Sequence, residues 1–402
     1  MALSIYRETF NTVYQKIRET FPFKNQKEYL QFQRLTEKFR DKIKAQYDPE
    51  YDFFLFLRNY LAQLHNSHIQ LGQHPSPPRY KPKGYSVLYL QEQYYLLKDQ
   101  RGIAKILFID GSPPKKILRY WEQYVSASTP QSRRQQAIKH LLSSFQAKSV
   151  NLVLTINNQE RKMRLKRQVI QFQSWKEVVI SKVILRDIGY LKIRTWSNQY
   201  LTEKMLMDTF FALSKQKLKG MIIDLRGNNG GNSRIAKSLA SHFFPQRVFF
   251  GSMKVRLHKN SLKCKRFYAY VEPAQPLFEK PIILLVDSHC ASTSEYFIIG
   301  LKDNKRAIVM GETTGGGCNG NPKKFSLPYG DSSFELLVST WLFYRPNGKP
   351  IEAHGIRPHI IVKPTFSGLK EKKDEVLIKA IHQMRVLITG KTDEHRLRKR
   401  KH

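Results

Sequence analysis

A serine at the end of one apolar run and a glycine-rich loop at the end of another are the residues of this 402-residue sequence best suited to hydrolytic chemistry. The apolar run 281–286 leads into the turn 288–292, and a helical pattern follows from Glu295, so Ser292 falls at a helix start. Free backbone N–H groups at a helix start favour negative charge. A serine there can attack a carbonyl carbon while such donors hold the oxyanion, each worth ~3 kcal/mol or more.

The glycine-rich loop reads Gly-Asn-Asn-Gly-Gly over residues 227–231 and follows the apolar strand-like run 221–226. Because the carboxyl ends of parallel strands lie at one edge of a sheet, this loop and the serine turn can face each other. The loop also fits a plain tight turn, since glycine tolerates unusual backbone angles. It lacks the Gly-x-Gly-x-x-Gly spacing of a nucleotide site. The triplet 315–317 is expected to form a flexible wall.

A serine hydroxyl needs an adjacent base to become a nucleophile at neutral pH. The spacing of the histidines does not choose among four candidates, which are His65, His68, His289 and His354. The first two are three residues apart at a predicted helix end, where a metal pair is one interpretation. No third ligand is apparent nearby, so a cap or a catalytic role for one of them is favoured.

We expect no metal ion and no cofactor. The three cysteines, Cys264, Cys290 and Cys318, lack Cys-x-x-Cys spacing, which argues against a zinc site and against a disulfide scaffold. The sequence also lacks His-Glu-x-x-His, an EF-hand loop and Gly-x-x-x-x-Gly-Lys-Ser/Thr.

Four parts are expected along the chain. Residues 1–75 show helical spacing of apolar side chains, for example from Phe10 to Ile17, and end at a linker rich in breakers. Residues 76–168 carry short strand-like runs and their own turns, which predicts a separate β-rich module. Residues 169–366 alternate strand and helix, and residues 367–402 form a C-terminal helix and a basic tail. The alternation predicts an α/β fold whose mainly parallel sheet is covered by helices.

Four segments, taken together, resemble peptidase family S41, the family of tail-specific or C-terminal-processing proteases and of the tricorn core. In chain order they are Leu64-His-Asn-Ser-His68, Ile222-Ile-Asp-Leu-Arg-Gly-Asn-Asn-Gly-Gly231, Cys290-Ala-Ser-Thr-Ser-Glu295 with Gly311-Glu-Thr-Thr-Gly315, and Gly348-Lys-Pro-Ile-Glu-Ala-His-Gly-Ile-Arg-Pro358. The resemblance implies the crotonase-like core of that family and a PDZ-like module over residues 76–168. The module lacks a clear Gly-Leu-Gly-Phe loop for binding a terminal carboxylate.

The resemblance also implies roles for individual residues. Ser292 aligns with the nucleophile, but the lysine that the processing proteases place 25 residues later is Gly317 here. The tricorn-like branch instead uses serine, histidine and glutamate. That pattern implies His68 as general base and Glu352, with Ser67, as the group that orients it. Backbone N–H groups of Gly230 or Gly231 and of Thr293 would form the oxyanion hole. Asn66 and His359 stand where the family usually has aspartate.

The expected function is therefore a serine peptidase that cleaves polypeptides through an acyl-enzyme on Ser292. If His68 is the general base and has the reference pKa of histidine, activity should fall as the pH drops through ~6.5, because the ring becomes protonated. The alternative is a weakly active or inactive scaffold of the same fold that binds a peptide or an apolar ligand.

The excess of basic residues gives a third interpretation, polyanion binding. Lys and Arg number 69 against 32 Asp and Glu, a net charge of +37. The basic residues are spread along the chain, which is typical of a solvated surface, so no specific nucleic acid partner is expected and contact with anionic surfaces should be weak. Neither a signal peptide nor a transmembrane run is visible. The expected location is cytoplasmic, or extracytoplasmic if the N-terminus has been processed.

Overall fold

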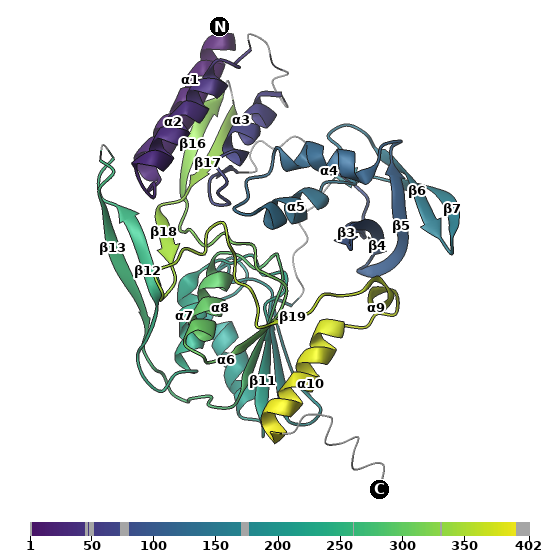
Figure 1. Ribbon diagram of the computed structural model, residues 1–402, viewed down its shortest axis with the longest axis vertical. Helices are drawn as coiled ribbons and strands as arrows, with labels where there is room; N and C mark the ends of the chain where they lie inside the picture. Colours follow the sequence, from purple (N-terminus) through teal and green to yellow (C-terminus); the bar gives the residue numbers. More distant parts are fainter. Residues whose placement is uncertain are drawn as a thin grey trace.

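The structure is a computed structural model, described here over residues 2–44, 47, 52–72, 80–169, 177–259, 261–329 and 332–390. Three groups of elements surround a central region of loops (Figure 1): N-terminal helices, a β-rich module, and a large sheet with its covering helices. None of the helices in this part of the chain is long and apolar enough to cross a membrane.

A six-stranded sheet forms the base of the molecule, in the order β19-β15-β14-β11-β10-β9. Neighbouring strands are parallel from β10 to β19, and only the edge strand β9 runs antiparallel. The strands are β9 (Val179–Ile184), β10 (Ile188–Ile193), β11 (Gly220–Asp224), β14 (Ile282–Val286), β15 (Ile308–Gly311) and β19 (Ile360–Ile361). Every residue of β11 and β14 is buried, which explains why both read as apolar runs in the sequence.

Helices cover both faces of this sheet. The helices α6 (Glu203–Ser214), α7 (Ser233–Ser241) and α8 (Thr293–Asp303) pack on one face, where Ile223 and Leu284 join their apolar side chains. On the other face, α10 (Glu375–Thr389) packs against a second cluster that includes Ile222 and Ile283. Alternate residues of one strand thus serve two cores.

The N-terminal helices share their apolar core with a distant β-hairpin. Helices are expected over this part of the chain, and the structure has α1 (Ala2–Thr20), α2 (Gln26–Arg40) and α3 (Asp52–Ala62) there. Apolar spacing predicts α1 and α3, and both are confirmed. Their aromatic core continues into the hairpin of β16 (Lys323–Tyr329) and β17 (Ser332–Val338), through Leu327 and Phe334 for example. The short strand β1 (Gln70–Leu71) pairs with β17. This association across more than 250 residues was not foreseen from the sequence.

The β-rich module, residues 80–169, is an antiparallel sheet in the order β3-β4-β5-β6-β7 with its own apolar core. Its strands are β3 (Tyr85–Leu90), β4 (Gln93–Lys98), β5 (Arg101–Ile109), β6 (Ser149–Ile156) and β7 (Gln159–Lys166). The helices α4 (Pro114–Glu122) and α5 (Pro130–Ile138) lie between β5 and β6, and β2 (Tyr80–Lys81) pairs with β8 (Gln168–Val169) to join the ends of the module. The predicted linker after Gly72 lies outside the described residues.

A separate three-stranded sheet, in the order β13-β12-β18, lies beside the N-terminal helices (Figure 1). Its strands are β12 (Val248–Arg256), β13 (Cys264–Val271) and β18 (Trp341–Tyr344). The short helix α9 (Phe366–Lys370) packs on β5 of the module, where Phe366 stacks on Tyr95. The basic tail expected after residue 390 lies outside the described residues.

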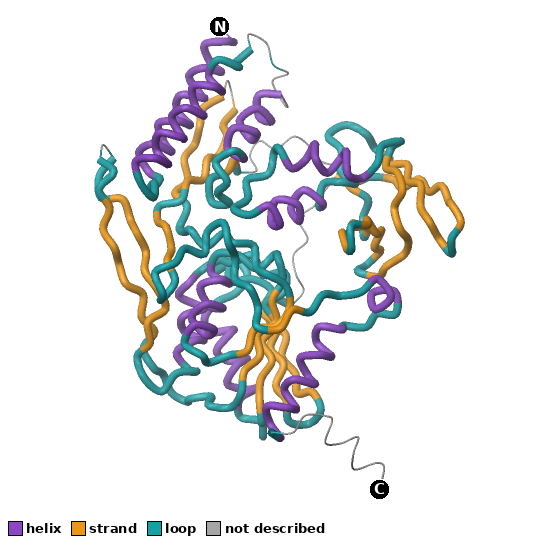
Figure 2. The backbone as a smooth tube through the Cα atoms, in the orientation of Figure 1, coloured by secondary structure: helices purple, strands orange, loops and turns teal. Residues whose placement is uncertain are grey.

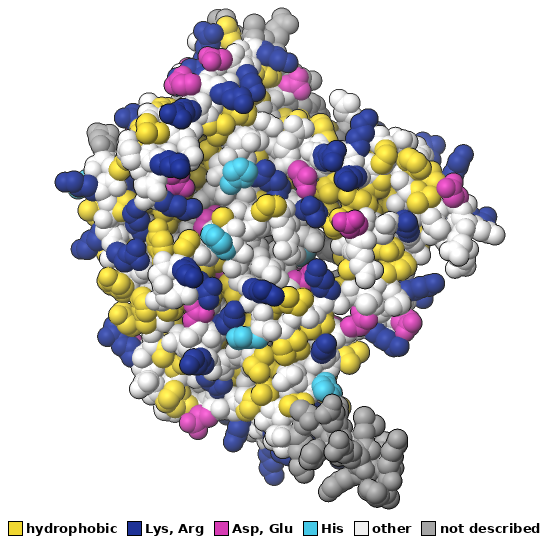
Figure 3. All heavy atoms as spheres, viewed as in Figure 1, with side chains coloured by type: hydrophobic (Ala, Val, Ile, Leu, Met, Phe, Trp, Pro, Cys, Tyr) yellow, Lys and Arg dark blue, Asp and Glu magenta, His cyan; other side chains and the backbone are white. Residues whose placement is uncertain are grey.

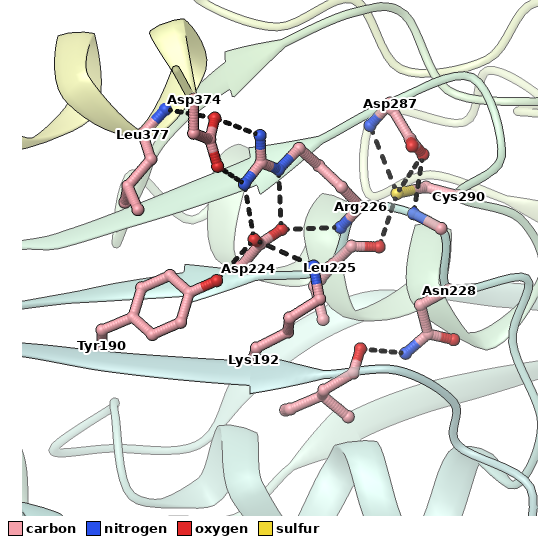
Figure 4. A network of polar contacts seen from close by, with 12 residues as sticks. Tyr190, Lys192, Asp224, Leu225, Arg226, Asn228, Asp287, Cys290, Asp374 and Leu377 are labelled. Carbon is pink, nitrogen blue, oxygen red and sulfur yellow. Dashed lines mark hydrogen bonds and ion pairs between the residues drawn. The ribbon is translucent and has the colours of Figure 1, made fainter. Parts of the chain in front are cut away.

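An arginine joins the central sheet to the C-terminal helix (Figure 4). The guanidinium of Arg226, just after β11, forms ion pairs with Asp224 and with Asp374, the N-cap of α10, at 2.7 Å each. Asp224 is fully buried and also accepts a hydrogen bond from the Tyr190 hydroxyl. Because Arg226 directly precedes the glycine-rich loop, these contacts fix where that loop begins.

Figure 2 shows loops gathered above one end of the central sheet, between the sheet, the N-terminal helices and the module. These loops include the segments that follow β11 and β14, because parallel neighbours end on the same side. The Asp287 carboxylate links the two segments, since it accepts hydrogen bonds from the backbone N–H groups of Gly227 and His289 at 3.0 Å each.

Candidate active site

Ser292 lies in the turn between β14 and α8, as the N-cap of α8. Its backbone has φ 55° and ψ −123°, a conformation that a residue with a side chain rarely adopts. The backbone N–H of Ser292 donates to the carbonyl of Gly317 at 2.7 Å, which helps to hold this turn. Strained turns of this kind occur at functional sites, where they expose a nucleophile at the end of a strand.

His68 is the histidine that the structure brings next to this serine. Its Nε2 lies 3.2 Å from the Ser292 Oγ, across 224 residues of sequence. The backbone N–H of His68 donates to the Asn66 Oδ1 at 2.9 Å, and the Ser339 hydroxyl reaches the same oxygen at 3.3 Å. This role requires only an acceptor oxygen, which the Asn66 amide supplies. Burial lowers the pKa of His68 to about 4, so the ring is neutral at pH 7.

The other three candidate histidines make different contacts. The His65 ring lies 2.7 Å from the Arg133 guanidinium, and His289 lies 3.5 Å from the Asp287 carboxylate. The His354 Nδ1 lies 2.9 Å from the backbone carbonyl of Glu352. Within the described residues, no three His, Cys, Asp or Glu side chains are grouped to hold a metal ion.

Glu352 is connected to His68 through two serine hydroxyls. The His68 Nδ1 lies 3.2 Å from the Ser67 Oγ, and the Ser67 Oγ lies 3.1 Å from the Ser128 Oγ. The Ser128 hydroxyl in turn donates to the Glu352 Oε1. Sequence analysis did not identify Ser128, because it lies in the β-rich module, outside every motif. Its only local signal is the Thr129-Pro130 pair, which marks the start of α5.

The Glu352 carboxylate is buried and fully engaged. Its second oxygen accepts hydrogen bonds from the backbone N–H groups of Cys318 and Asn319, at 3.2 Å each. Burial raises the pKa of Glu352 to about 7, although the hydrogen bonds from Ser128 and from the backbone oppose this shift. The carboxylate is therefore close to half ionised at neutral pH.

The glycine-rich loop approaches the nucleophile closely. A Cβ atom on Gly230, where φ is +109°, would lie 2.7 Å from the Ser292 Cβ, so this position requires glycine. The Gly230 N–H donates to the Asn228 Oδ1 at 3.0 Å. The backbone N–H groups of Gly231 and Thr293 have no acceptor within the described part of the chain, which leaves them free for a ligand oxygen.

The glycine triplet 315–317 is buried and packed, unlike the flexible wall expected from the sequence. The buried Glu295 carboxylate holds this segment through the Thr314 hydroxyl and the Gly316 N–H. A Cβ atom on Gly317 would lie 2.1 Å from the Ser67 Oγ. The serine that contacts His68 thus fills the space that a side chain at position 317 would need. Cys290 and Cys318 are both free and buried.

Comparison with known sequences identifies the central part of the chain. The sequence model of Peptidase family S41 matches residues 187–362. A carboxy-terminal-processing protease of Bartonella bacilliformis is 30% identical over 179 residues, which cover 44% of this chain and 39% of that protein. The carboxy-terminal processing protease CtpB of Bacillus subtilis is 28% identical over 183 residues, covering 45% and 35%. The chain thus spans about two fifths of the length of these curated relatives.

Solved structures share the fold over nearly the whole chain. The structure of mature CPAF complexed with lactacystin has a TM-score of 0.80 at 15% identity, and the match covers 96% of this chain and 100% of that one. The photosystem II D1 C-terminal processing protease has a TM-score of 0.52 at 16% identity, covering 91% and 96%. At such identities these likenesses describe the fold alone. The family match confirms the resemblance seen in the sequence motifs: residues 187–362 of the chain match the sequence model of Peptidase family S41.

Proposed function

We propose that the chain is a serine peptidase that hydrolyses peptide bonds in polypeptides through an acyl-enzyme on Ser292. The observation that carries this proposal is the 3.2 Å contact between the Ser292 Oγ and the Nε2 of a buried, neutral histidine, His68. A neutral imidazole within hydrogen-bond distance can remove the hydroxyl proton. The membership of residues 187–362 in peptidase family S41 supports the same chemistry.

In this mechanism the Ser292 Oγ attacks the scissile carbonyl carbon while its proton moves to the His68 Nε2. The negative charge that develops on the carbonyl oxygen is held by the backbone N–H groups of Gly231 and Thr293, the second of which lies at the start of α8. The His68 imidazolium then gives its proton to the leaving amine as the C–N bond breaks. Water, deprotonated by the same ring, releases the acyl group from Ser292.

Ser67 and Glu352 are positioning residues in this scheme. They hold the His68 Nδ1 side of the ring and stabilise the imidazolium that forms during attack. The reaction needs Glu352 in its ionised form, and burial raises the pKa of this carboxyl to about 7. We therefore assign the acid side of the pH profile to Glu352, in place of the value near 6.5 expected for an unperturbed histidine.

We also propose that the chain is divided into four parts, which are residues 1–75, 76–168, 169–366 and 367–402. Residues 76–168 are the PDZ-like module. The five-stranded antiparallel sheet and the separate apolar core of that segment support it. The polypeptide would reach Ser292 among the loops where the module, the N-terminal helices and the sheet meet (Figure 2).

The test is labelling by a fluorophosphonate probe, which reacts with activated serines. We expect the wild-type protein to label at Ser292, assigned by fragment ions, and Ser292→Ala to lose both the label and peptide hydrolysis while keeping its melting temperature. The matched control is Ser238→Ala on α7, whose side chain has no place in the site and which should label fully. Wild-type protein that neither labels nor cleaves would favour the inactive, ligand-binding scaffold. A label that persists in Ser292→Ala would disprove the assignment of the nucleophile.

A further inference from the structure

We infer that Ser128 is a positioning residue for catalysis: its hydroxyl joins Glu352 to the Ser67–His68 pair, and the β-rich module supplies it to the peptidase domain. The inference rests on the proposed function, because it gives Ser128 a part in preparing His68 as the base. It adds that the site is complete only when residues 80–169 are docked in the position seen here.

Hydrogen-bond counting shows why this hydroxyl is needed. A serine hydroxyl has one proton to donate and two lone pairs that accept, whereas an ionised carboxylate only accepts. The Ser128 hydroxyl is placed to donate its one proton to either of two acceptors, the Glu352 Oε1 and the Ser67 Oγ, the second at 3.1 Å. Its oxygen accepts from the Ser67 backbone N–H at 3.0 Å. Ser128 is therefore held by Glu352 on one side and by Ser67 on the other.

The same chain of contacts reaches the His68 ring. The Ser67 Oγ, which accepts from the Ser128 hydroxyl at 3.1 Å, lies 3.2 Å from the His68 Nδ1. A ring proton on Nδ1 directed at this oxygen leaves the Nε2 lone pair toward the Ser292 Oγ, and that is the tautomer that can act as a base. The chain of hydroxyls thus passes the influence of the Glu352 charge to the ring.

The position of Ser128 is fixed by contacts on both sides. The next residue, Thr129, caps α5 by accepting from the Ser132 N–H at 3.0 Å and donates to the carbonyl of Gly315 at 2.9 Å. A Cβ atom on Gly316 would lie 2.5 Å from the Thr129 Cγ2, so the module segment and the glycine triplet fit closely. A larger residue at position 316 would collide with the module, so the close packing of the module requires glycine there.

A second set of contacts anchors α5 to the N-terminal segment that carries His68. The Arg133 guanidinium donates to the carbonyl of Ala62 at 2.8 Å and contacts the His65 ring. The α3 side chains of Arg58 and Asn59 donate to the backbone carbonyls of Tyr124 and Gln123. The module thus touches both the histidine segment and the loop next to Glu352, and Ser128 lies between them.

The decisive variant is Ser128→Ala, measured by steady-state kinetics and a pH profile. We expect kcat to fall by at least about 10-fold, with KM nearly unchanged. The upper limit is ~10⁴-fold, which is the loss seen when a triad carboxylate no longer functions. The acid limb of kcat should move to higher pH, because a hydrogen bond that favours ionised Glu352 is lost. The other groups that act on this carboxyl are the backbone N–H groups of Asn319 and Cys318, the charge of Lys24 and the neighbouring carboxyl of Glu295, and the variant leaves them in place.

Two further variants keep the test decisive. Ser143→Ala makes the same change at a buried serine of the same module whose hydroxyl has no partner within the described residues, and it should behave as wild type. Ser128→Cys keeps the volume but donates weakly, so it should lower kcat even if the alanine variant unfolds. Because Ser67 and Ser128 act in one chain, Ser67→Ala together with Ser128→Ala should cost little more than either change alone.

The outcomes separate this inference from the proposed function. Wild-type protein that fails to label at Ser292 contradicts the proposed function. Wild-type protein that labels, combined with a Ser128→Ala variant whose kcat and acid limb match those of Ser143→Ala, contradicts only the role of Ser128. The role of Ser128 is also contradicted if the loss of kcat in the Ser67/Ser128 double variant equals the product of the two single losses, because the two residues would then act independently.

Discussion

At the scale of single residues, the site depends on two buried groups whose pKa values move in opposite directions. Burial lowers the pKa of His68 to about 4 and raises the pKa of Glu352 to about 7, because in each case the charged form loses solvent. At pH 7 the base is therefore neutral, as it must be to accept a proton. The carboxyl that stabilises its charged form is only partly ionised, so a small change in pH alters the population of the active state.

Replacement of Glu352 by glutamine tests this assignment directly. Glu352→Gln keeps the shape and can still accept from the Cys318 and Asn319 N–H groups, but it removes the charge. We expect kcat to fall by up to ~10⁴-fold with KM nearly unchanged, because the charge acts as the imidazolium forms. Glu335→Gln, at a more exposed carboxylate paired with Lys324, is the control and should be silent.

The pH profile of wild type gives an independent measurement. Because Glu352 must be ionised, kcat should increase with pH through about 7, and this limb should vanish in Glu352→Gln. A limb that stays at the same pH in the glutamine variant would show that another group controls it, and His68 would be the next candidate.

At the scale of secondary-structure elements, the Asp224–Arg226–Asp374 contacts hold β11 and α10 together beneath the site (Figure 4). Burial disfavours ionised Asp224, but the hydrogen bonds and charge of Arg226 outweigh it and bring the pKa of Asp224 to about 2. The ionised form is thus favoured in the folded state. Its contribution to stability is present above the unfolded pKa of 3.8 and is lost as the pH falls through about 2.

Asp224→Asn should lower the free energy of unfolding at pH 7 by about 3 kcal/mol, the low end for a broken buried ion pair, because Asp374 still faces Arg226. Urea unfolding at several pH values would measure this, and the difference from wild type should shrink as the pH approaches 2. The control is Asp208→Asn, an exposed i,i+4 pair with Lys204 worth at most ~0.5 kcal/mol. An equal loss at pH 7 and pH 2 would show that packing, and not charge, is responsible.

At the scale of the whole molecule, the dominant property is the net charge of +37. Figure 3 shows Lys and Arg side chains scattered over the face in view, with no single area that gathers them. Scattered charge raises the local concentration of anionic molecules without selecting one of them. The face in view therefore presents no gathered basic area to serve as a nucleic acid site, and we propose that the net charge favours acidic polypeptides.

We therefore expect kcat/KM for an acidic peptide to fall steeply as salt is raised from 50 to 500 mM, roughly the range over which the Debye length shrinks from above 10 Å to below 5 Å. A neutral peptide with the same residues at the scissile bond should change little. Stopped assays at several salt concentrations measure both. If the two peptides respond equally, the surface charge has no part in substrate capture.

The sequence determined the local elements and the family. Apolar spacing predicted α1, α3 and the strands of the module, and the buried runs β11 and β14 were recognisable because a strand covered on both faces must be apolar throughout. The strand–turn–helix pattern around Ser292 was also evident, since it depends on neighbours in the chain. These features need only short-range information.

Only the tertiary structure decided which side chains meet. His68 and Ser292 are 224 residues apart, as are Ser128 and Glu352, and no local pattern encodes such distances. The spacing of the histidines left four candidates, and the structure places His68 alone of these at hydrogen-bond distance from the serine. The sequence around Ser128 marks only a helix start and gave no sign of its role in the site. Its role arises from the packing of a separate module against a glycine loop, and packing between distant segments is a property of the folded chain.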